Sequence, residues 1–493
     1  MYPAFQTFLV LGLSRSGRSG AEFLLKKGAT VYVYDDLQND RIEQTAKQLE
    51  EQGAKRVKKD DLFKTAEFCD ALVLSPGIPI DHALAVAFKR SGKAVLGEME
   101  LASRYLRGTV IAVTGTNGKT TTAYMLRSIL KEAGKRVGII GTLGAFFEEH
   151  EWQFGLTTPD PIQLQSVLAS MQRLGAEYVV MEASAHALYY EKLSGIRFSA
   201  CIFTNLSQDH LDFFKTMSAY KSAKLKLFED CPIAVLNGDD ETGRSISRLR
   251  EREGGKTVLY GLHTPTDAFA VITREGLNGT ECMLNVNDKL CKVRLSLVGR
   301  HNVYNALASA TCAVELGLDV GAVASGLKKL KRVKGRLERV AQYHGADVYV
   351  DFAHTPDGLE KSLEALRQHT KGRLVCLFGC GGNRDREKRA LMGEIASKKS
   401  DFSVLTSDNP RYEDPLDIIS EIEKGYRRFG CRYVVVPDRA RAIEYALDFL
   451  VQGDVLLIAG KGGEDTQEIM GIKYPFDDQT VVEKLTSSQK DGV

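Results

Sequence analysis

Short apolar runs alternate with helix-length amphipathic stretches from one end of the chain to the other. TFLVLGL, TVYVYDD and LVCLFGC are examples of the runs, and SGRSGAEFLLKKG is a stretch with apolar residues at helical spacing. This alternation is typical of parallel β-sheets covered by helices, so we expect an α/β fold. Residues 267–297 differ, because polar and apolar positions alternate there, which predicts an antiparallel addition.

The pattern starts anew at two places, and these define the expected domains. A strand, a glycine-containing turn and a helix begin near residue 109, after a polar stretch around residues 104–108. The basic segment KKLKRVKGRLERV later precedes the strand-like run DVYVDFAH. We therefore predict three domains: a Rossmann-like domain over 1–105, a P-loop ATPase-like domain with a parallel sheet over 106–337, and a second Rossmann-like domain over 338–493.

Composition and charge exclude several classes of protein. Of 493 residues, 66 are Lys or Arg and 64 are Asp or Glu, and the formal net charge of +2 offers no broad basic field for nucleic acid. The sequence has no apolar run of about 18 residues and no basic leader, so we expect a cytoplasmic protein without membrane insertion. The nine Cys form no CxxC pair, which indicates free thiols rather than zinc ligands.

The strongest local motif is VTGTNGKTTT at residues 113–122, between an apolar run and an amphipathic stretch. A phosphate-binding loop needs this context, because backbone N–H groups at a helix N-terminus cradle the phosphates. A lysine then neutralises the terminal phosphates and a hydroxyl reaches Mg²⁺, roles that we assign to Lys119 and Thr120. Val113 stands where the strict pattern has its first glycine, and an ordinary glycine-rich turn is the alternative. The expected ATP-binding residues of this loop are Gly115, Thr116, Asn117, Gly118, Lys119, Thr120 and Thr121.

A second glycine-rich turn, GLSRSG at residues 12–17, follows the first apolar run. It is similar to a dinucleotide-binding fingerprint, but Ser14 replaces the middle glycine that lets the backbone approach a pyrophosphate. Asp35 ends the next strand, where a carboxylate can bind a ribose hydroxyl. A nicotinamide cofactor and a nucleoside diphosphate both fit this pattern.

Ionisable residues follow other predicted strands: Glu182 in VVMEASAHAL, His210 in FTNLSQDHLD and Lys224 in AYKSAKLKLF. Open parallel sheets place ligands at the carboxyl ends of their strands, so Glu182 and His210 are candidates to share an Mg²⁺ with Thr120 and the ATP phosphates. Each residue taken alone is more often a solvated or helix-capping side chain. The hypothesis requires that the three residues lie close together beside the phosphate loop.

Motifs in order along the chain resemble those of the Mur ligase family of peptidoglycan synthesis. From about residue 106 onward, the motifs similar to the MurE-type branch are GTNGKT, TTPD, FTNLSQDHLD, AYKSAK, GRHNVYN, KGRLE, DFAHTPDGLE, FGCGGNRDREKR, TSDNPR and AGKGGE. The first hundred residues, with LGLSRSGRSGAEFLLKKGATVYVYDD and LSPGIP, are instead similar to the MurD-type branch. The resemblance implies a hybrid architecture in which the N-terminal domain binds a UDP group.

The resemblance implies an ATP-dependent amide ligase. The D-Glu side-chain carboxylate of UDP-MurNAc-L-Ala-D-Glu would be phosphorylated to an acyl phosphate, which the amine of meso-diaminopimelate would attack. ATP, Mg²⁺ at two sites and a carbamylated lysine are implied, and we expect a monomer that acts on small molecules. Addition of L-lysine by a MurE-type enzyme or of D-glutamate by a MurD-type enzyme are alternatives. A nicotinamide oxidoreductase and a noncatalytic nucleotide-binding scaffold are alternatives from other classes.

The resemblance also assigns roles in the ATP reaction to single residues. The implied metal ligands are Thr120, Glu182, His210 and Lys224 as its carbamate. Further implied ATP contacts are Asn302 and Arg336. The implied catalytic residues are Lys119, Glu182, His210, Lys224, Asp351 and His354, of which the last two would reach ATP from the third domain.

Substrate contacts are implied by the same resemblance. For the UDP-linked substrate they are Ser14, Arg15, Asp35, Gly77, Thr157, Thr158, Ser184 and Lys192. Tyr190 and Lys192 depart from the family, in which Gln and Arg are usual. For the incoming amino acid they are Arg384, Asp408, Asn409, Pro410, Arg411, Gly460 and Glu464, with Gly463 in place of a frequent His. Arg411 would grip the distant carboxylate of meso-diaminopimelate, which lysine lacks.

Overall fold

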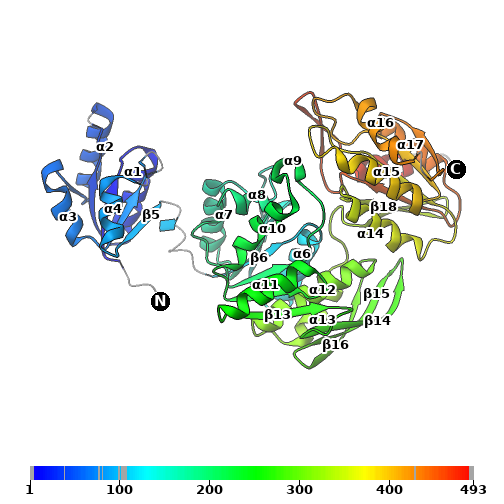
Figure 1. Cartoon of the computed structure of the whole chain (residues 1–493), viewed down its shortest axis with the longest axis horizontal. Helices are drawn as coiled ribbons and strands as arrows, with labels where there is room; N and C mark the ends of the chain where they lie inside the picture. Colours follow the sequence, from blue (N-terminus) through cyan, green and yellow to red (C-terminus); the bar gives the residue numbers. More distant parts are fainter. Residues whose placement is uncertain are drawn as a thin grey trace. The chain divides into compact units, whose positions relative to one another are not determined.

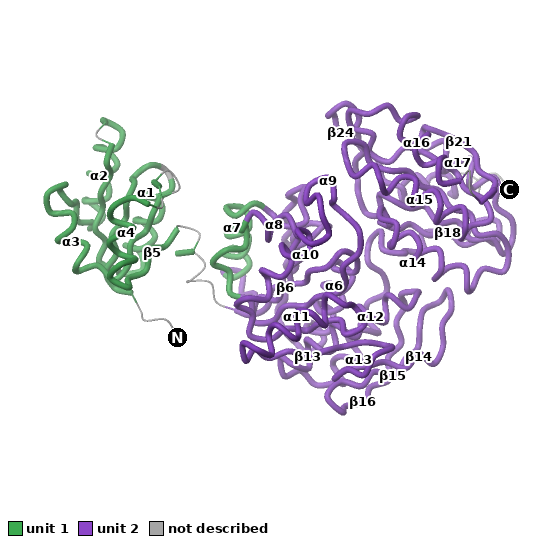
Figure 2. The backbone as a smooth tube through the Cα atoms, viewed as in Figure 1, with its two compact units in different colours: residues 1–107, 160–172, 191–197 green, residues 108–159, 173–190, 198–493 purple. Residues whose placement is uncertain are grey.

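The computed structural model of the protein describes residues 5–37, 39–75, 78–79, 81–97, 100–101, 108–426 and 429–487, with the backbone alone at residue 15. The chain forms two compact units (Figure 2). The first unit contains residues 1–107, 160–172 and 191–197, and the second contains residues 108–159, 173–190 and 198–493. Within the described residues, the first unit carries a five-stranded sheet, and the second carries sheets of eleven, six and two strands.

The first unit is built on a parallel sheet of the Rossmann type, ordered β3-β2-β1-β4-β5. Strand β1 (Thr7–Leu11) is buried almost throughout, as its apolar run predicts for a strand that helices cover on both faces. Gly17 in helix α1 (Arg15–Lys26) has no room for a side chain, because a Cβ there would collide with the carbonyl oxygen of Gly12. The other elements are β2 (Thr30–Tyr34), α2 (Asp40–Glu51), β3 (Lys55–Arg56), α3 (Leu62–Phe68), β4 (Ala71–Leu74), α4 (Ala83–Arg90) and β5 (Ala94–Gly97).

The eleven-stranded sheet of the second unit is ordered β16-β15-β14-β13-β12-β11-β6-β10-β7-β8-β9 in the described part of the chain. Strand β6 (Thr109–Thr114) pairs in parallel with both β10 (Tyr178–Glu182) and β11 (Ala200–Phe203). After β6 the chain first adds strands β7 and β10 on one side of it and then β11 on the other side. Open α/β sheets bind ligands beyond the carboxyl ends of their strands where the strand order reverses in this way. The remaining strands are β7 (Val137–Gly141), β8 (Gly144–Phe147), β9 (His150–Trp152), β12 (Ile233–Asn237), β13 (Lys256–Gly261), β14 (Ala268–Gly276), β15 (Gly279–Val286) and β16 (Lys289–Leu295).

Three helices, α6 (Lys119–Glu132), α12 (Arg300–Glu315) and α13 (Val320–Lys329), cover part of this sheet and share one apolar core with it (Figure 1). Helices α6 and α13 approach so closely that a Cβ at Gly326 would collide with the backbone of Ile129. The first turn of α6, which follows the phosphate loop, is held by α12, because Thr122 Oγ1 donates to Asn305 Oδ1 at 3.2 Å and Ser309 Oγ donates to Thr122 O at 2.9 Å. The other helices around this sheet are α8 (Ala185–Tyr189), α9 (Leu211–Phe214), α10 (Met217–Leu225) and α11 (Glu241–Arg252), whereas α7 (Pro161–Arg173) belongs, except for its last residue, to the first unit.

The six-stranded sheet is ordered β17-β18-β22-β19-β20-β21 and is parallel except for the β17–β18 pair. A buried bidentate ion pair between Arg439 and Asp478 ties two of its helices together, with N–O distances of 2.7 and 2.8 Å. Its elements are β17 (Glu338–Tyr343), β18 (Ala346–Asp351), α14 (Pro356–Arg367), β19 (Leu374–Phe378), α15 (Glu387–Lys399), β20 (Phe402–Leu405), α16 (Pro415–Tyr426), β21 (Arg432–Val435), α17 (Arg439–Asp448), β22 (Val455–Ala459) and α18 (Asp478–Ser487), with the hairpin β23 (Thr466–Ile469) and β24 (Ile472–Pro475).

The predicted α/β class is confirmed, and each of the three predicted domains contains one of the three larger sheets. The first predicted boundary falls in residues 102–107, outside the described residues, so the exact boundaries stay predictions. The antiparallel addition predicted over residues 267–297 forms β14–β16 and continues the central sheet. All nine cysteines are free thiols, and eight of them are buried. Across the described ranges, the helices lack the combination of length and apolar content needed to cross a bilayer.

Candidate active site

The phosphate loop joins β6 to α6 at the centre of the large sheet. Gly115 and Gly118 have φ angles of +147° and +85°. A Cβ would collide with the Thr204 hydroxyl at Gly115 and with the Asn305 side-chain oxygen at Gly118. The glycines are therefore required both for the backbone conformation and for the close approach of neighbouring chain.

The segment after β11 already holds this loop in place. Thr116 N donates to the Asn205 carbonyl at 2.8 Å, and Asn117 N donates to Asn205 Oδ1 at 3.0 Å. The Thr204 hydroxyl and the Asn205 amide both donate to the Asn117 carbonyl, at 2.6 and 3.0 Å. The loop is thus ordered before any phosphate binds, which reduces the entropy lost on binding.

Two lysine ammonium groups converge on the loop carbonyls. Lys119 Nζ donates to Gly115 O and Thr116 O at 2.9 and 2.8 Å. Lys224 Nζ donates to Gly115 O at 2.8 Å and lies 4.6 Å from the centre of the Tyr220 ring. Burial lowers the pKa of both lysines, and the charge of Lys119 adds to the effect at Lys224, whose pKa falls well below its ordinary value. Lys224 therefore loses its proton far more readily than a surface lysine.

A pocket of about 420 Å³ opens beside the loop, a size that suits a small-molecule ligand. Arg336 Nη2 donates to Thr120 Oγ1 at 2.8 Å, and its guanidinium lies 4.4 Å from the centre of the Phe352 ring. Asn302 is buried and its amide donates to Val298 O at 2.8 Å, so it holds the start of α12. The predicted ATP contacts that line the pocket are Asn117, Gly118, Thr120, Thr121, Asn302 and Arg336.

Glu182 ends β10, the strand next to β6, and its side chain is buried. Its oxygens accept from Thr142 N at 2.9 Å and from the Thr142 hydroxyl at 3.1 Å, and its charge acts on Lys119. Among the residues that the structure describes, no three His, Cys, Asp or Glu side chains are arranged to hold a metal by themselves. Mg²⁺ usually binds one or two carboxylates together with substrate phosphates, so Glu182 and Thr120 fit a site that ATP completes.

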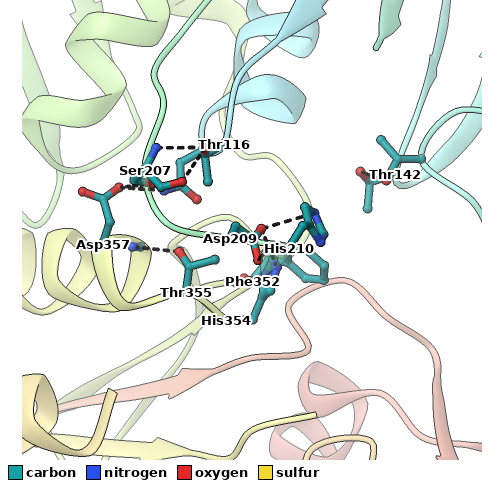
Figure 3. A network of polar contacts seen from close by, with 12 residues as sticks. Thr116, Thr142, Ser207, Asp209, His210, Phe352, His354, Thr355 and Asp357 are labelled. Carbon is teal, nitrogen blue, oxygen red and sulfur yellow. Dashed lines mark hydrogen bonds and ion pairs between the residues drawn. The ribbon is translucent and has the colours of Figure 1, made fainter. Parts of the chain in front are cut away.

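Asp209 brings two predicted catalytic histidines together (Figure 3). Its Oδ2 lies 3.3 Å from His210 Nε2 and 3.9 Å from His354 Nε2. Burial lowers the pKa of His210 to about 3. Burial alone would raise the pKa of Asp209, but His210, His354, Lys388 and the hydrogen bond from the His210 backbone N–H together outweigh it and lower that pKa to about 2. At neutral pH we therefore expect a carboxylate beside a neutral His210 imidazole, whose unprotonated ring nitrogen can bind a cation.

Asp351 lines the pocket, but its carboxylate is occupied by bonds within the protein. It accepts from Leu337 N at 2.6 Å, Ala353 N at 3.1 Å and Ser362 Oγ at 2.8 Å. These bonds fix the segment that joins the two large sheets and the turn that carries His354. The structure thus places Asp351 where it orients its neighbours.

Three of the predicted contacts to the UDP-linked substrate lie next to Glu182. Thr157 Oγ1 is 3.1 Å from Thr142 Oγ1, and Thr158 Oγ1 donates to the Glu182 carbonyl at 2.9 Å. Ser184 N donates to Thr158 Oγ1 at 3.0 Å. Thr157, Thr158 and Ser184 therefore belong to one network at the end of β10.

The other predicted contacts to this substrate lie in the first unit. Asp35 accepts from Leu13 N at 2.6 Å and from Leu37 N at 2.8 Å, so its carboxylate shapes the turn before α1. Lys192 Nζ pairs with Asp160 Oδ1 at 2.6 Å. Ser14 begins α1 without a side-chain capping bond among the described residues. Gly77 and the side chain of Arg15 lie outside the described residues.

The predicted amino-acid pocket lies at the carboxyl ends of β20 and β22. Glu464 Oε2 accepts from Asn409 Nδ2 at 2.9 Å and from the buried ammonium of Lys461 at 3.0 Å. Arg411 Nη1 donates to Gly382 O at 2.9 Å, and its Nε lies 3.2 Å from Glu468 Oε2. The Glu464 carboxylate and the Arg411 guanidinium are thus each held in place by neighbouring protein groups.

Close backbone packing shapes the rest of this pocket. Gly460 has a φ of +116°, and a Cβ there would lie 2.5 Å from Asp408 Oδ2. At Gly382 a Cβ would collide with the carbonyl of Pro410. At Gly381 it would approach Arg384 Cγ to 3.7 Å, so Arg384 leaves the loop next to the 408–411 segment. The structure therefore brings all seven predicted amino-acid contacts into adjoining loops.

Three residues at the site were not singled out from the sequence: Asp209, Thr142 and Asp357. Asp209 directly precedes His210 after a predicted strand, and that position was an available signal. No neighbouring residue in the sequence marks Thr142 or Asp357, because their hydrogen-bond partners, Glu182 and Asn117, come from distant segments.

Models of three domains of one family match this chain. The Mur ligase MurD-like N-terminal domain matches residues 6–97, the Mur ligase middle domain matches residues 113–313, and the Mur ligase glutamate ligase domain matches residues 335–462. The predicted combination of a MurD-like N-terminal domain with a MurE-type remainder is confirmed, because the relatives below are of that type.

Individual relatives cover most of the chain. UDP-N-acetylmuramoyl-L-alanyl-D-glutamate--2,6-diaminopimelate ligase of Syntrophomonas wolfei is 42% identical over 385 residues, which are 76% of this chain and 78% of that protein. The ligase of the same name from Clostridium tetani is 36% identical over 97% of this chain and 91% of that protein. A solved structure of a ligase of this name is 30% identical with a TM-score of 0.58, covering 98% of this chain and 92% of that one. The chain therefore belongs to the Mur ligase family.

Proposed function

We propose that this protein is an ATP-dependent ligase that joins meso-diaminopimelate to UDP-MurNAc-L-Ala-D-Glu in peptidoglycan precursor synthesis. The relatives at 42% and 36% identity carry that activity in their names. The observation that carries the proposal is the preformed phosphate loop, which shares its pocket with the C-terminal sheet domain that bears the DNPR loop.

The reaction requires two transfers. The D-Glu side-chain carboxylate attacks the γ-phosphorus of ATP, which breaks the bond to ADP and forms an acyl phosphate. The amine of the amino acid then attacks the acyl carbon, loses a proton and expels phosphate, which leaves an amide. Lys119 and Arg336 offset the negative charge that accumulates at the phosphates, an effect that is large in a pocket from which water is excluded. Burial lowers the pKa of His210 to about 3 and also lowers the pKa of His354, so both imidazoles are neutral at pH 7 and His210 is a weak base, better suited to bind a cation than to take a proton. The proton that the amine releases can pass to the departing phosphate or to water.

Glu182, Thr120 and His210 are the proposed Mg²⁺ ligands. The ion would neutralise phosphate charge and orient the γ-phosphoryl group. Carbamylation of Lys224 is part of the proposal. Its buried amine, with a pKa well below the ordinary value, can attack CO₂ in its unprotonated form and release a proton on forming the carbamate. The product is an anion, which suits a second cation as an ammonium does not.

The choice of amino acid is proposed to depend on charge placement in the C-terminal loops. The far end of meso-diaminopimelate carries an ammonium and a carboxylate. Arg411 and Arg384 supply cations for carboxylates, and Glu464 supplies the anion. L-Lysine has no far carboxylate and would leave Arg411 paired only with Glu468. We further propose that the enzyme acts as a monomer in the cytoplasm, where ATP and nucleotide-linked substrates are available.

The test is phosphate release by the purified protein with ATP, Mg²⁺ and the nucleotide dipeptide, measured against a panel of amino acids. We expect release that needs both substrates and is fastest with meso-diaminopimelate. Preference for L-lysine would correct the amino acid, and preference for D-glutamate with UDP-MurNAc-L-Ala would correct the whole assignment. A sedimentation experiment at working concentration tests the monomer.

A further inference from the structure

One side chain of the phosphate loop faces away from the central sheet and towards the C-terminal domain. The backbone N–H and carbonyl of Asn117 are both bonded to the segment after β11. Its side-chain Nδ2 donates to Asp357 Oδ2 at 2.7 Å, across 240 positions of sequence, and at the longer distance of 3.4 Å to Ser207 Oγ in the segment after β11. The backbone of Asn117 thus binds the segment after β11, and the shorter of its two side-chain hydrogen bonds connects the loop to helix α14.

Asp357 collects further donors from both sides of this contact. Ser207 Oγ, in the segment that holds the loop, lies 3.4 Å from Asp357 Oδ2, and Lys361 Nζ lies 2.8 Å from the same oxygen. Figure 3 shows Asp357 beside Ser207, which in turn contacts Thr116. Lys361 also lines the nucleotide pocket. One carboxylate therefore connects the phosphate loop, the segment behind it and a cation in the pocket wall.

The first turn of α14 fixes the position of Asp357 relative to the phosphate loop. Thr355 caps the helix by accepting from Gly358 N at 3.1 Å, which sets the first turn. A Cβ at Gly358 would lie 3.6 Å from Asn117 Oδ1, so the first turn of α14 already approaches the Asn117 amide. The turn just before α14 carries His354, which faces Asp209 of the central domain. Docking this turn correctly therefore places both Asp357 and His354.

We propose that Asp357 is a positioning residue for phosphoryl transfer: through Asn117 it aligns the phosphate loop with the C-terminal domain. The inference rests on the proposed function, because it concerns the geometry of the ATP site. Phosphoryl transfer depends on alignment of the phosphate, the acceptor and the catalytic side chains, and small misplacements are costly in rate. Asp357 is not among the residues that line the pocket beside the loop, so its removal should lower kcat more than it changes substrate binding.

The experiment compares Asp357→Ala with Glu360→Ala, a matched control on the same helix. Glu360 is also a carboxylate in an ion pair, but its partner is Lys399 at 3.5 Å. We expect Asp357→Ala to lower kcat for dual-substrate phosphate release at least about tenfold, the usual effect of losing a hydrogen bond to a charged group. The KM for meso-diaminopimelate should stay within about threefold, because the amino-acid loops are untouched. Glu360→Ala should keep kcat within about twofold.

A double-mutant cycle with Asn117→Ala separates positioning from a general loss of structure. If Asp357 acts through Asn117, the double variant should be no slower than the slower single variant. Effects that multiply, or an Asp357→Ala protein as fast as Glu360→Ala, would overturn the inference. If Asp357→Ala unfolds at a lower temperature than Glu360→Ala, its kcat is not used, and the test is the kcat of Asn117→Ala. A normal kcat in Asn117→Ala would overturn the inference. An unmodified protein without substrate-dependent phosphate release would refute the proposed function instead.

Discussion

Replacing Arg411 with alanine should reduce the selectivity for meso-diaminopimelate without disturbing the ATP site. Arg411 has a φ of +52°, and alanine adopts this conformation at a cost similar to that of arginine, so the backbone of the loop should persist. The guanidinium is held by Gly382 O at 2.9 Å and by Glu468 at 3.2 Å. These contacts orient the group before substrate binds, which is the condition for a strong carboxylate contact.

The magnitude follows from the kind of bond that is lost. A hydrogen bond between charged groups contributes about 1.5–3 kcal/mol, and each 1.4 kcal/mol is about tenfold in affinity. We therefore expect the apparent KM for meso-diaminopimelate to rise about 10- to 100-fold. The partly exposed ion pair of Arg411 with Glu468 is worth at most about 1 kcal/mol, so the free energy of unfolding should change little.

The assay is steady-state phosphate release with meso-diaminopimelate, L-lysine and ATP varied in turn. The ratio of kcat/KM for meso-diaminopimelate over L-lysine should fall by at least about tenfold, whereas the KM for ATP should remain within about threefold. An unchanged ratio would show that Arg411 does not read the far carboxylate. An equal loss with both amino acids would show that it holds the loop rather than the substrate.

Three further predictions test the ATP site and its surroundings. Lys119→Ala should abolish phosphate release while leaving the unfolding temperature nearly unchanged, because the loop is also held by the segment after β11; near-normal turnover would refute the ATP-site assignment. Lys224→Ala should be nearly inactive and partly rescued by formate or acetate, since only an added anion can replace a carbamate; full activity without rescue would show an ordinary buried lysine. Burial lowers the pKa of His301 to about 4. Between about pH 6.5 and 4, this histidine therefore binds a proton in the unfolded chain but not in the folded protein. Stability should therefore fall as the pH drops from about 6.5 to 4, and the urea midpoint of His301→Asn should fall less steeply; parallel slopes would contradict this.

Local features of this protein could be predicted from the sequence. The strands and helices follow from the alternation of apolar runs with amphipathic stretches, because burial of one face is encoded every two or every three to four residues. The phosphate loop was predicted for the same reason, since its glycines, lysine and hydroxyls lie within one contiguous segment. The amino-acid loops and the family were predicted from motifs that likewise occupy short runs of sequence.

The burial and pairing of single charged groups were decided only by the tertiary structure. Lys221, Lys224 and Lys226 lie in one short stretch whose periodicity does not say which of them is buried, yet Lys224 alone is 1% exposed and reaches the phosphate loop. The bond from Asn117 to Asp357 likewise joins residues 240 positions apart. Such contacts depend on which faces of distant helices and strands pack together, and local periodicity does not specify that. Their electrostatic consequences depend in turn on how completely the packing excludes water, so the ionisation of the catalytic groups is a property of the assembled domains.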